Sequence, residues 1–128
     1  KLVNYLKNSE YVKKVYFPSL HKNEYQYEIF KREYTDSGSL ISFEINGDKK
    51  KTFKILNQFK VIKLAVSLGS IDTLIQHPSS MTHSNLSSQY KEKLGINDSL
   101  LRCSVGIEDI KDIIDDFNYA FGQSDIIP

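Results

Sequence analysis

The segment Ile41–Ile45 reads I-S-F-E-I and places an apolar side chain at every second position, with polar side chains between them. Successive side chains of a β-strand point to opposite faces, so this alternation predicts a strand with one face on a core and one polar face. The segment Leu101–Val105, L-R-C-S-V, repeats the pattern, and so do Ile62, Leu64 and Val66. Strands buried on both faces read instead as continuous apolar runs. The sequence therefore predicts a sheet that is covered on one face only.

Segments with helical spacing alternate with these strands. The last is the clearest, because its apolar residues recur at i, i+3, i+4, i+7 and i+11: Ile110, Ile113, Ile114, Phe117 and Phe121. We expect Gly122 to end this helix and its acidic residues to be solvated on the outward face: Asp109, Asp112, Asp115 and Asp116. Further helices are expected over residues 2–12, 23–34, 50–59 and 87–94, and further strands over 15–17 and 73–76. The fold class predicted from this order is α+β, a small mainly antiparallel sheet with helices packed on one face.

Composition excludes several classes of protein. The chain has 128 residues, which suits one compact domain, and a formal net charge of +1, which recruits neither nucleic acid nor an anionic membrane. No apolar stretch is long enough to cross a bilayer, and the first residues are too polar for a signal peptide. The single cysteine, Cys103, rules out an internal disulfide framework and fits a reducing cytoplasm. Because Cys103 alternates with Leu101 and Val105, we expect a buried, inert thiol.

Arg102 is the first candidate for a functional residue, since it stands in a strand whose other face is apolar. Its guanidinium can bind a carboxylate through two parallel hydrogen bonds, but a solvated or structurally paired arginine fits the same pattern. Ser67, in the V-S-L-G segment, stands at the end of a predicted strand, where a turn or cap role is the usual one. Strand alternation places it on the same side of the sheet as Arg102. The spacing of His21, His77 and His83 matches no common zinc site, so we expect structural histidines and no bound metal.

Several segments together resemble one enzyme family. They are V-S-L-G (66–69), M-T-H (81–83), L-G-I-N-D-S-L-L-R (94–102), R-C-S-V-G-I-E-D (102–109) and G-S-L-I-S-F-E-I (38–45). In combination they are similar to the closing third of the Cys/Met-metabolism enzymes that use pyridoxal 5'-phosphate (PLP), among them cystathionine γ-synthase, the cystathionine lyases, methionine γ-lyase and the O-acyl-homoserine sulfhydrylases. Serine replaces the common glycine at Ser39 and Ser70, and Asp72 stands where glutamate is usual.

The resemblance implies roles for individual residues. Arg102 would bind the α-carboxylate of an amino-acid substrate, Ser67 and Leu68 would line the site and help to hold that carboxylate, and Thr82 would lie close to the substrate. Residues 1–128 would form a single C-terminal substrate-binding domain. The upstream domain would hold most of the PLP and supply the Schiff-base lysine, which this chain lacks, so no catalytic residue is expected here and the isolated chain should be inactive.

For the full protein, the resemblance implies a cytoplasmic enzyme, commonly a homo-tetramer, that acts on C–S bonds of sulfur amino acids. The residues do not decide between lyase, synthase and sulfhydrylase, although Val66 is more similar to bacterial members than to the eukaryotic γ-lyases. The alternative is a standalone, non-catalytic module that binds a ligand or another protein. An enzyme complete within these residues is disfavoured, because the chain supplies few nucleophile–base pairs. The length of the natural protein separates the first hypothesis from the other two.

Overall fold

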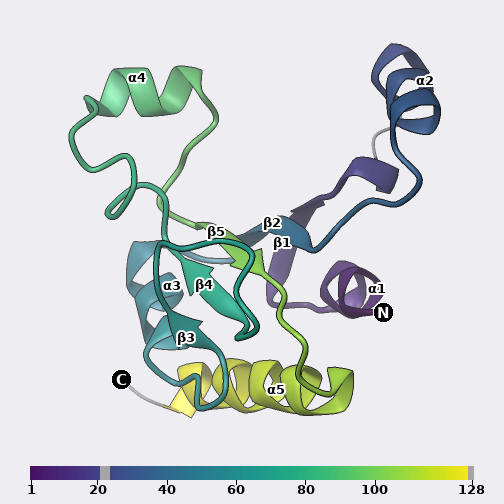
Figure 1. Cartoon of the computed structure of the whole chain (residues 1–128). Coiled ribbons are helices and arrows are strands. Elements are labelled where there is room, and N and C mark those ends of the chain that lie inside the picture. Colours follow the sequence, from purple (N-terminus) through teal and green to yellow (C-terminus); the bar gives the residue numbers. More distant parts are fainter. Residues whose placement is uncertain (21–23, 127–128) are drawn as a thin grey trace.

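A five-stranded sheet in the order β1-β2-β5-β4-β3 forms the centre of the computed structural model, which describes residues 1–20 and 24–126. Figure 1 shows the strands β1 (Val12–Tyr16), β2 (Leu40–Ile45), β3 (Lys63–Leu64), β4 (Leu74–Gln76) and β5 (Leu100–Ser104). All neighbouring strands pair antiparallel except β3 and β4, which are parallel. The prediction of a mainly antiparallel α+β sheet is confirmed.

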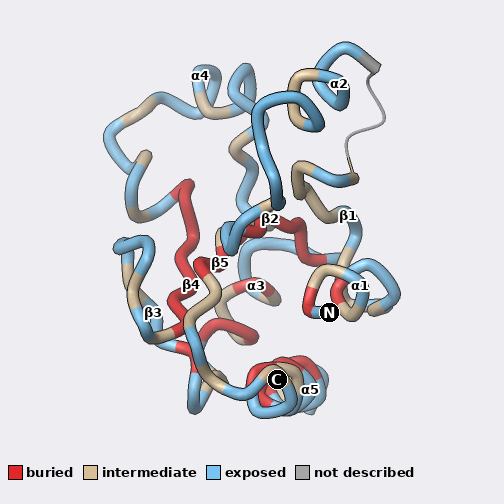
Figure 2. Tube along the Cα trace, turned by 45° about the vertical axis from the view of Figure 1, so that its right-hand side comes forward, coloured by how far each residue is buried: buried red, intermediate tan, exposed pale blue. Residues whose placement is uncertain are grey.

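Three helices lie on one side of this sheet: α1 (Leu2–Asn8), α3 (Lys49–Leu56) and α5 (Ile110–Ile126). The short helix η1 (Pro18–Leu20) follows β1, while α2 (Glu24–Glu33) and α4 (Ser88–Lys93) project from the other side. Figure 2 shows that the sheet and α5 carry much of the buried surface, whereas α2 and α4 are largely exposed. The other face of the sheet is therefore left without a packed helical layer.

The core forms where the apolar rows of β2 and β5 meet the helices. Ile41, Phe43 and Ile45 are at most 3% exposed, as their alternation predicts. Phe117 of α5 lies at the centre of an aromatic cluster, with its ring centroid 5.9 Å from that of Phe43 and 5.0 Å from that of Phe59. Burying each such side chain stabilises the fold by about 1.5–3 kcal/mol, so the helices are held chiefly by this face.

Several expectations about element boundaries are wrong. The first helix ends at Asn8 instead of residue 12, because Val12 already begins β1. The last helix continues through Gly122 to Ile126, because Phe121 and Ser124 on either side of the glycine are buried, and this packing outweighs a helix penalty of about 1 kcal/mol. Of the apolar row predicted in the third strand, only Ile62 is buried, while Leu64 and Val66 are about half exposed. That strand shortens to the two residues of β3 at the sheet edge.

Asp116 is a further correction, since it is 5% exposed instead of solvated. Its carboxylate accepts hydrogen bonds from the backbone N–H groups of Lys60 at 2.8 Å, Val61 at 2.9 Å and Ile62 at 2.8 Å. Hydrogen bonds to an ionised carboxylate are stronger than neutral ones. Asp116 therefore ties α5 to the segment that leads into β3.

We predict that Asp116→Ala lowers the free energy of unfolding by about 3 kcal/mol, because it removes the acceptor for these donors, including a buried one. Asp115→Ala, at an exposed position of the same helix, is the matched control and should change it by less than about 0.5 kcal/mol. Urea unfolding followed by circular dichroism gives both values. Equal losses in the two variants would contradict the role of Asp116.

Candidate functional site

One row of polar side chains crosses the sheet face that lies opposite the core. The register pairs Arg102 of β5 with Ser42 of β2 on one side and with Gln76 of β4 on the other. Because Leu101 and Cys103, the neighbours of Arg102 along β5, are fully buried on the core side, strand alternation directs Arg102 to the opposite face. The sheet thus brings residues from three strands into one line across its middle.

The guanidinium of Arg102 is partly buried and lacks a full set of partners. One terminal nitrogen, Nη2, donates to the carbonyl oxygen of Val66 at 3.4 Å, whereas the buried Nε has no hydrogen-bond partner. No ion pair joins Arg102 to a carboxylate in the described part of the chain. Burial lowers the pKa of Arg102, although an arginine stays charged in proteins. A partly dehydrated cation without an anionic partner is suited to bind an anion.

Gln76 and Thr82 extend this row. The Gln76 side chain is 1% exposed, and its Nε2 donates to the Thr82 hydroxyl at 3.5 Å, while its Oε1 is buried without a partner. The Thr82 hydroxyl also shares a hydrogen bond of 2.9 Å with Nδ1 of His83 and is exposed to solvent. The structure therefore connects Thr82, which the sequence singled out, to the strand beside Arg102 through Gln76, which it did not.

The V-S-L-G segment lies against β5 at both of its ends. Val66 accepts the hydrogen bond from Arg102, and the backbone N–H of Gly69 donates to the hydroxyl of buried Ser104 at 3.1 Å. Gly69 has a φ of +70°, a conformation that glycine adopts without steric cost. Between these two contacts Ser67 and Leu68 are exposed. Arg102 thus contacts the backbone of this segment at Val66, next to Ser67, which lies beyond the end of β3.

The V-G-I-E-D segment after β5 has a structural explanation. The Glu108 carboxylate accepts from the backbone N–H of Thr73 at 2.6 Å and from its hydroxyl at 2.7 Å, and the Gly106 N–H donates to the same hydroxyl at 2.9 Å. Burial alone would raise the pKa of Glu108, but these donors bring it below its usual value. A Cβ at Gly106 would lie 2.3 Å from the carbonyl oxygen of Ile71, so the backbones pack too closely for any other residue.

Glu44 departs from the expected solvated strand face, since it is 6% exposed. The Tyr16 hydroxyl donates to its carboxylate, and Lys13 lies 3.7 Å from the other oxygen. Burial, followed by the bond to Glu44, raises the pKa of Tyr16 to about 12, so this hydroxyl keeps its proton at neutral pH. A buried carboxylate that already has a hydrogen-bond donor and a cation is a structural pair.

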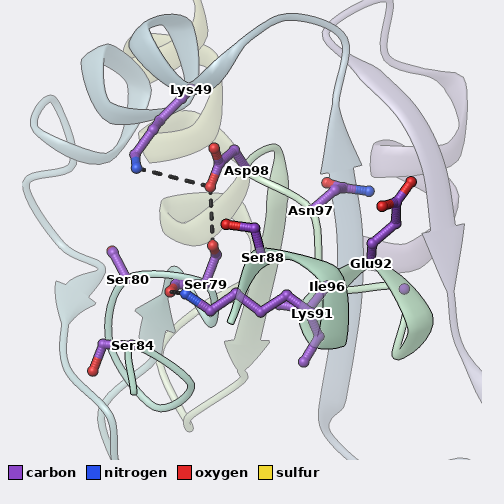
Figure 3. Close-up of a pocket in the computed structure, with 11 residues that line it drawn as sticks. Lys49, Ser79, Ser80, Ser84, Ser88, Lys91, Glu92, Ile96, Asn97 and Asp98 are labelled. Atoms are coloured by element: carbon purple, nitrogen blue, oxygen red, sulfur yellow. Dashed lines mark hydrogen bonds and ion pairs between the residues drawn. The ribbon is translucent and has the colours of Figure 1, made fainter. Parts of the chain in front are cut away.

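A cavity of about 720 Å³ lies elsewhere, between the start of α3, the turn after β4, and α4. Lys49 is 3.8 Å from the Asp98 carboxylate, and Lys91 donates to the Ser79 carbonyl at 2.7 Å (Figure 3). The Ser79 hydroxyl donates to Asp98 at 2.9 Å. Lys49 and Asp98 therefore already pair with each other, and Arg102 does not line the cavity. The unmatched groups on the sheet face are therefore the stronger site, although that face is open.

Two remaining candidates are structural. His77 is fully buried, with Nδ1 2.7 Å from the Ser80 hydroxyl and Nε2 3.0 Å from the Asp98 carbonyl, and burial lowers its pKa. Cys103 is also fully buried. His21 lies outside the described residues, and within them no group of three His, Cys, Asp or Glu side chains could hold a metal ion. The described helices also include none long and apolar enough to span a membrane.

Comparison with known proteins gives the family. The sequence profile of the Cys/Met metabolism PLP-dependent enzymes matches residues 1–122. The chain belongs to this family. It is 46% identical over 115 residues to the L-methionine gamma-lyase of Fusobacterium nucleatum subsp. nucleatum, a match that covers 90% of this chain and 29% of that protein.

Solved structures of the family share the fold. A cystathionine gamma synthase of Xanthomonas oryzae pv. oryzae, in complex with cystathionine, superposes with a TM-score of 0.88 at 30% identity and covers 98% of this chain and 32% of that one. A putative O-acetylhomoserine (thiol)-lyase of Campylobacter jejuni with N'-pyridoxyl-lysine-5'-monophosphate superposes with a TM-score of 0.85 at 33% identity, over 94% and 29% of the two chains. The chain therefore spans about three tenths of the length of these relatives and has the fold of fold-type I PLP enzymes.

We predict that Cys103 reacts with a thiol reagent at pH 8 about a thousandfold more slowly in the native protein than after unfolding. Burial, with a smaller effect of Glu108, raises the pKa of this thiol from 9.0 to about 12, which removes almost all of the reactive thiolate. Mass spectrometry of the labelled Cys103 peptide, with and without denaturant, measures the two rates. Comparable rates would show that the thiol is accessible.

Proposed function

We propose that this chain forms the substrate-carboxylate side of a PLP-dependent enzyme that makes or breaks C–S bonds in sulfur amino acids. The observation that carries the proposal is the guanidinium of Arg102, which is partly dehydrated, charged and without an ion pair in the described chain. A carboxylate is the anion that an amino acid offers, and a guanidinium binds it with two parallel hydrogen bonds. Family membership makes an amino-acid substrate the expected ligand.

The neighbouring residues have narrower roles. Ser67 and Leu68 line the site, and the backbone of their segment helps to hold the carboxylate, because Val66 and Gly69 fix that segment against β5. Thr82 lies on the substrate side, since its hydroxyl is exposed while it also binds Gln76. These groups bind and orient, and none of them is placed here as a catalytic acid, base or nucleophile.

In this proposal, the full-length protein binds PLP. When bound, PLP acts as an electron sink for the reacting amino acid. The hydrogen-bond donors on this sheet face fit the carboxylate of an amino-acid substrate. We therefore propose that residues 1–128 form a C-terminal substrate-binding domain. In this proposal, an upstream domain holds the cofactor through a lysine. Assembly as a homo-oligomer and a cytoplasmic location complete the proposal. The names of the relatives include both lyases and synthases, so the proposal extends to the class and not to one reaction.

One prediction of this proposal concerns the cofactor. The protein purified from its full natural gene should absorb visible light near the position expected for a PLP–lysine bond, and borohydride should abolish this band and attach the cofactor covalently. Intact mass before and after reduction measures both the chain length and the added group. A colourless protein of about the present length would instead support a standalone binding module.

Another prediction of this proposal concerns Arg102. In the full-length enzyme, Arg102→Ala should lower kcat/KM about ten- to a hundredfold, because a hydrogen-bonded contact to a charged group contributes about 1.5–3 kcal/mol. Arg102→Lys should also lower it, since an ammonium cannot reproduce the two parallel bonds.

The matched control for these variants is Arg32→Ala. Arg32 pairs with Glu33 on the exposed helix α2 and is not one of the polar residues on the sheet face around Arg102. Initial rates with L-methionine and L-cystathionine give kcat/KM for each protein. Near-normal kcat/KM in Arg102→Ala would remove this arginine from the substrate site.

A further inference from the structure

We propose that Gln76 is a positioning residue for Arg102: when an amino-acid carboxylate binds, the Gln76 Oε1 accepts a hydrogen bond from Nε–H of Arg102 and fixes the plane of the guanidinium. This inference rests on the proposed function, because it assigns to Arg102 the substrate carboxylate. It places Gln76 behind the arginine, in contact with Arg102 and not with the substrate.

The register brings the two side chains together. Gln76 of β4 is the direct partner of Arg102 on β5, and both residues point to the face opposite the core. Side chains at directly opposed positions of an antiparallel pair have Cβ atoms about 4.5–5.5 Å apart. Both side chains are long enough to meet across that separation without any movement of the backbone.

The unsatisfied atoms of the two residues are complementary. Among the described residues, two buried side-chain atoms lack a hydrogen-bond partner, and these are Oε1 of Gln76 and Nε of Arg102. The first can only accept a hydrogen bond and the second can only donate one. A buried polar atom without a partner costs free energy, so pairing these atoms would relieve both costs at once.

The orientation of the Gln76 amide supports the same pairing. Its Nε2 donates to Thr82 Oγ1, which leaves Oε1 for Arg102. The reverse orientation would direct an N–H₂ group, a donor with partial positive charge, at a guanidinium that has donors only. The hydroxyl of Thr82 thus helps to orient the Gln76 amide so that its oxygen faces Arg102.

Carboxylate binding would bring Nε of Arg102 and Oε1 of Gln76 into hydrogen-bond contact. Without a ligand, the guanidinium is held by one bond of 3.4 Å to Val66, which is near the long limit for a hydrogen bond. A carboxylate bound by the two Nη groups would bring the guanidinium into one plane and leave Nε–H directed along the sheet. At that position the Gln76 oxygen is the available acceptor.

The test compares two probes on the full-length holoenzyme by titration calorimetry. L-norleucine has the carboxylate and ammonium groups of an amino acid but no sulfur leaving group, and pentan-1-amine is the same molecule without the carboxylate. Gln76→Met keeps the side-chain length and removes the acceptor, so it should weaken L-norleucine binding about tenfold and change pentan-1-amine binding by less than about twofold. Gln76→Glu places a carboxylate beside Arg102 that would pair with the guanidinium in place of the substrate carboxylate, so this variant should also weaken L-norleucine binding.

A double-mutant cycle separates positioning from a general structural effect. Lysine has no guanidinium and no Nε–H that Gln76 could orient. In the Arg102→Lys background, Gln76→Met should therefore have little further effect on L-norleucine binding. Gln89→Met, at an exposed position of α4, is the control for the substitution itself. Thermal unfolding of each variant checks that the fold is retained.

The outcomes separate the two proposals. If L-norleucine affinity is unchanged in Gln76→Met, if both probes weaken equally, or if the effect persists in the Arg102→Lys background, the role of Gln76 is wrong while that of Arg102 stands. If instead Arg102→Lys leaves L-norleucine affinity intact, the carboxylate site itself is wrong, and the role of Gln76 falls with it.

Discussion

The central position of β5 is the constraint on which the rest of the structure depends. This strand pairs with β2 along its whole length and with β4 along its second half, so it is hydrogen-bonded at both edges. A slip of one residue would exchange its two faces, expose Leu101 and Cys103, and bury Arg102 in the aromatic core. The loss of apolar burial fixes the register, and the register in turn determines which residues stand beside Arg102.

Contacts outside the ladder hold the short strands of this sheet in place. Glu108 and Gly106 bind Thr73 at the start of β4, while Asp116 binds the backbone that leads into β3. Strands of two or three residues form few ladder bonds of their own, and the carboxylates of Glu108 and Asp116 supply the missing order. Hence the residues that follow Arg102 in the sequence would serve the proposed site indirectly, by keeping β4 and Gln76 in register with β5.

Local periodicity was sufficient for the central strands, because Ile41–Ile45 and Leu101–Cys103 alternate in the structure as they do in the sequence. It failed where a distant partner decides burial: Asp116 is buried by donors more than fifty residues away, and Leu64 is exposed because its strand lies at an edge. Alternation identified Arg102 as a polar residue between apolar neighbours, while its proposed role came from the family resemblance. Gln76 was not singled out, since its proposed role depends on a cross-strand partner that no local pattern encodes.

The unmatched charge of Arg102 has a consequence for selectivity. Folding removes part of the water around the guanidinium before any ligand arrives, and the favourable core packing beneath the sheet offsets that cost. A ligand with a carboxylate restores the lost interactions, whereas a neutral or cationic ligand leaves the cation dehydrated and unpaired. A site of the proposed kind would therefore discriminate by the penalty for an incorrect partner as much as by attraction to the correct one. The partner of such a site is accordingly defined by its negative charge before the shape of its side chain is considered.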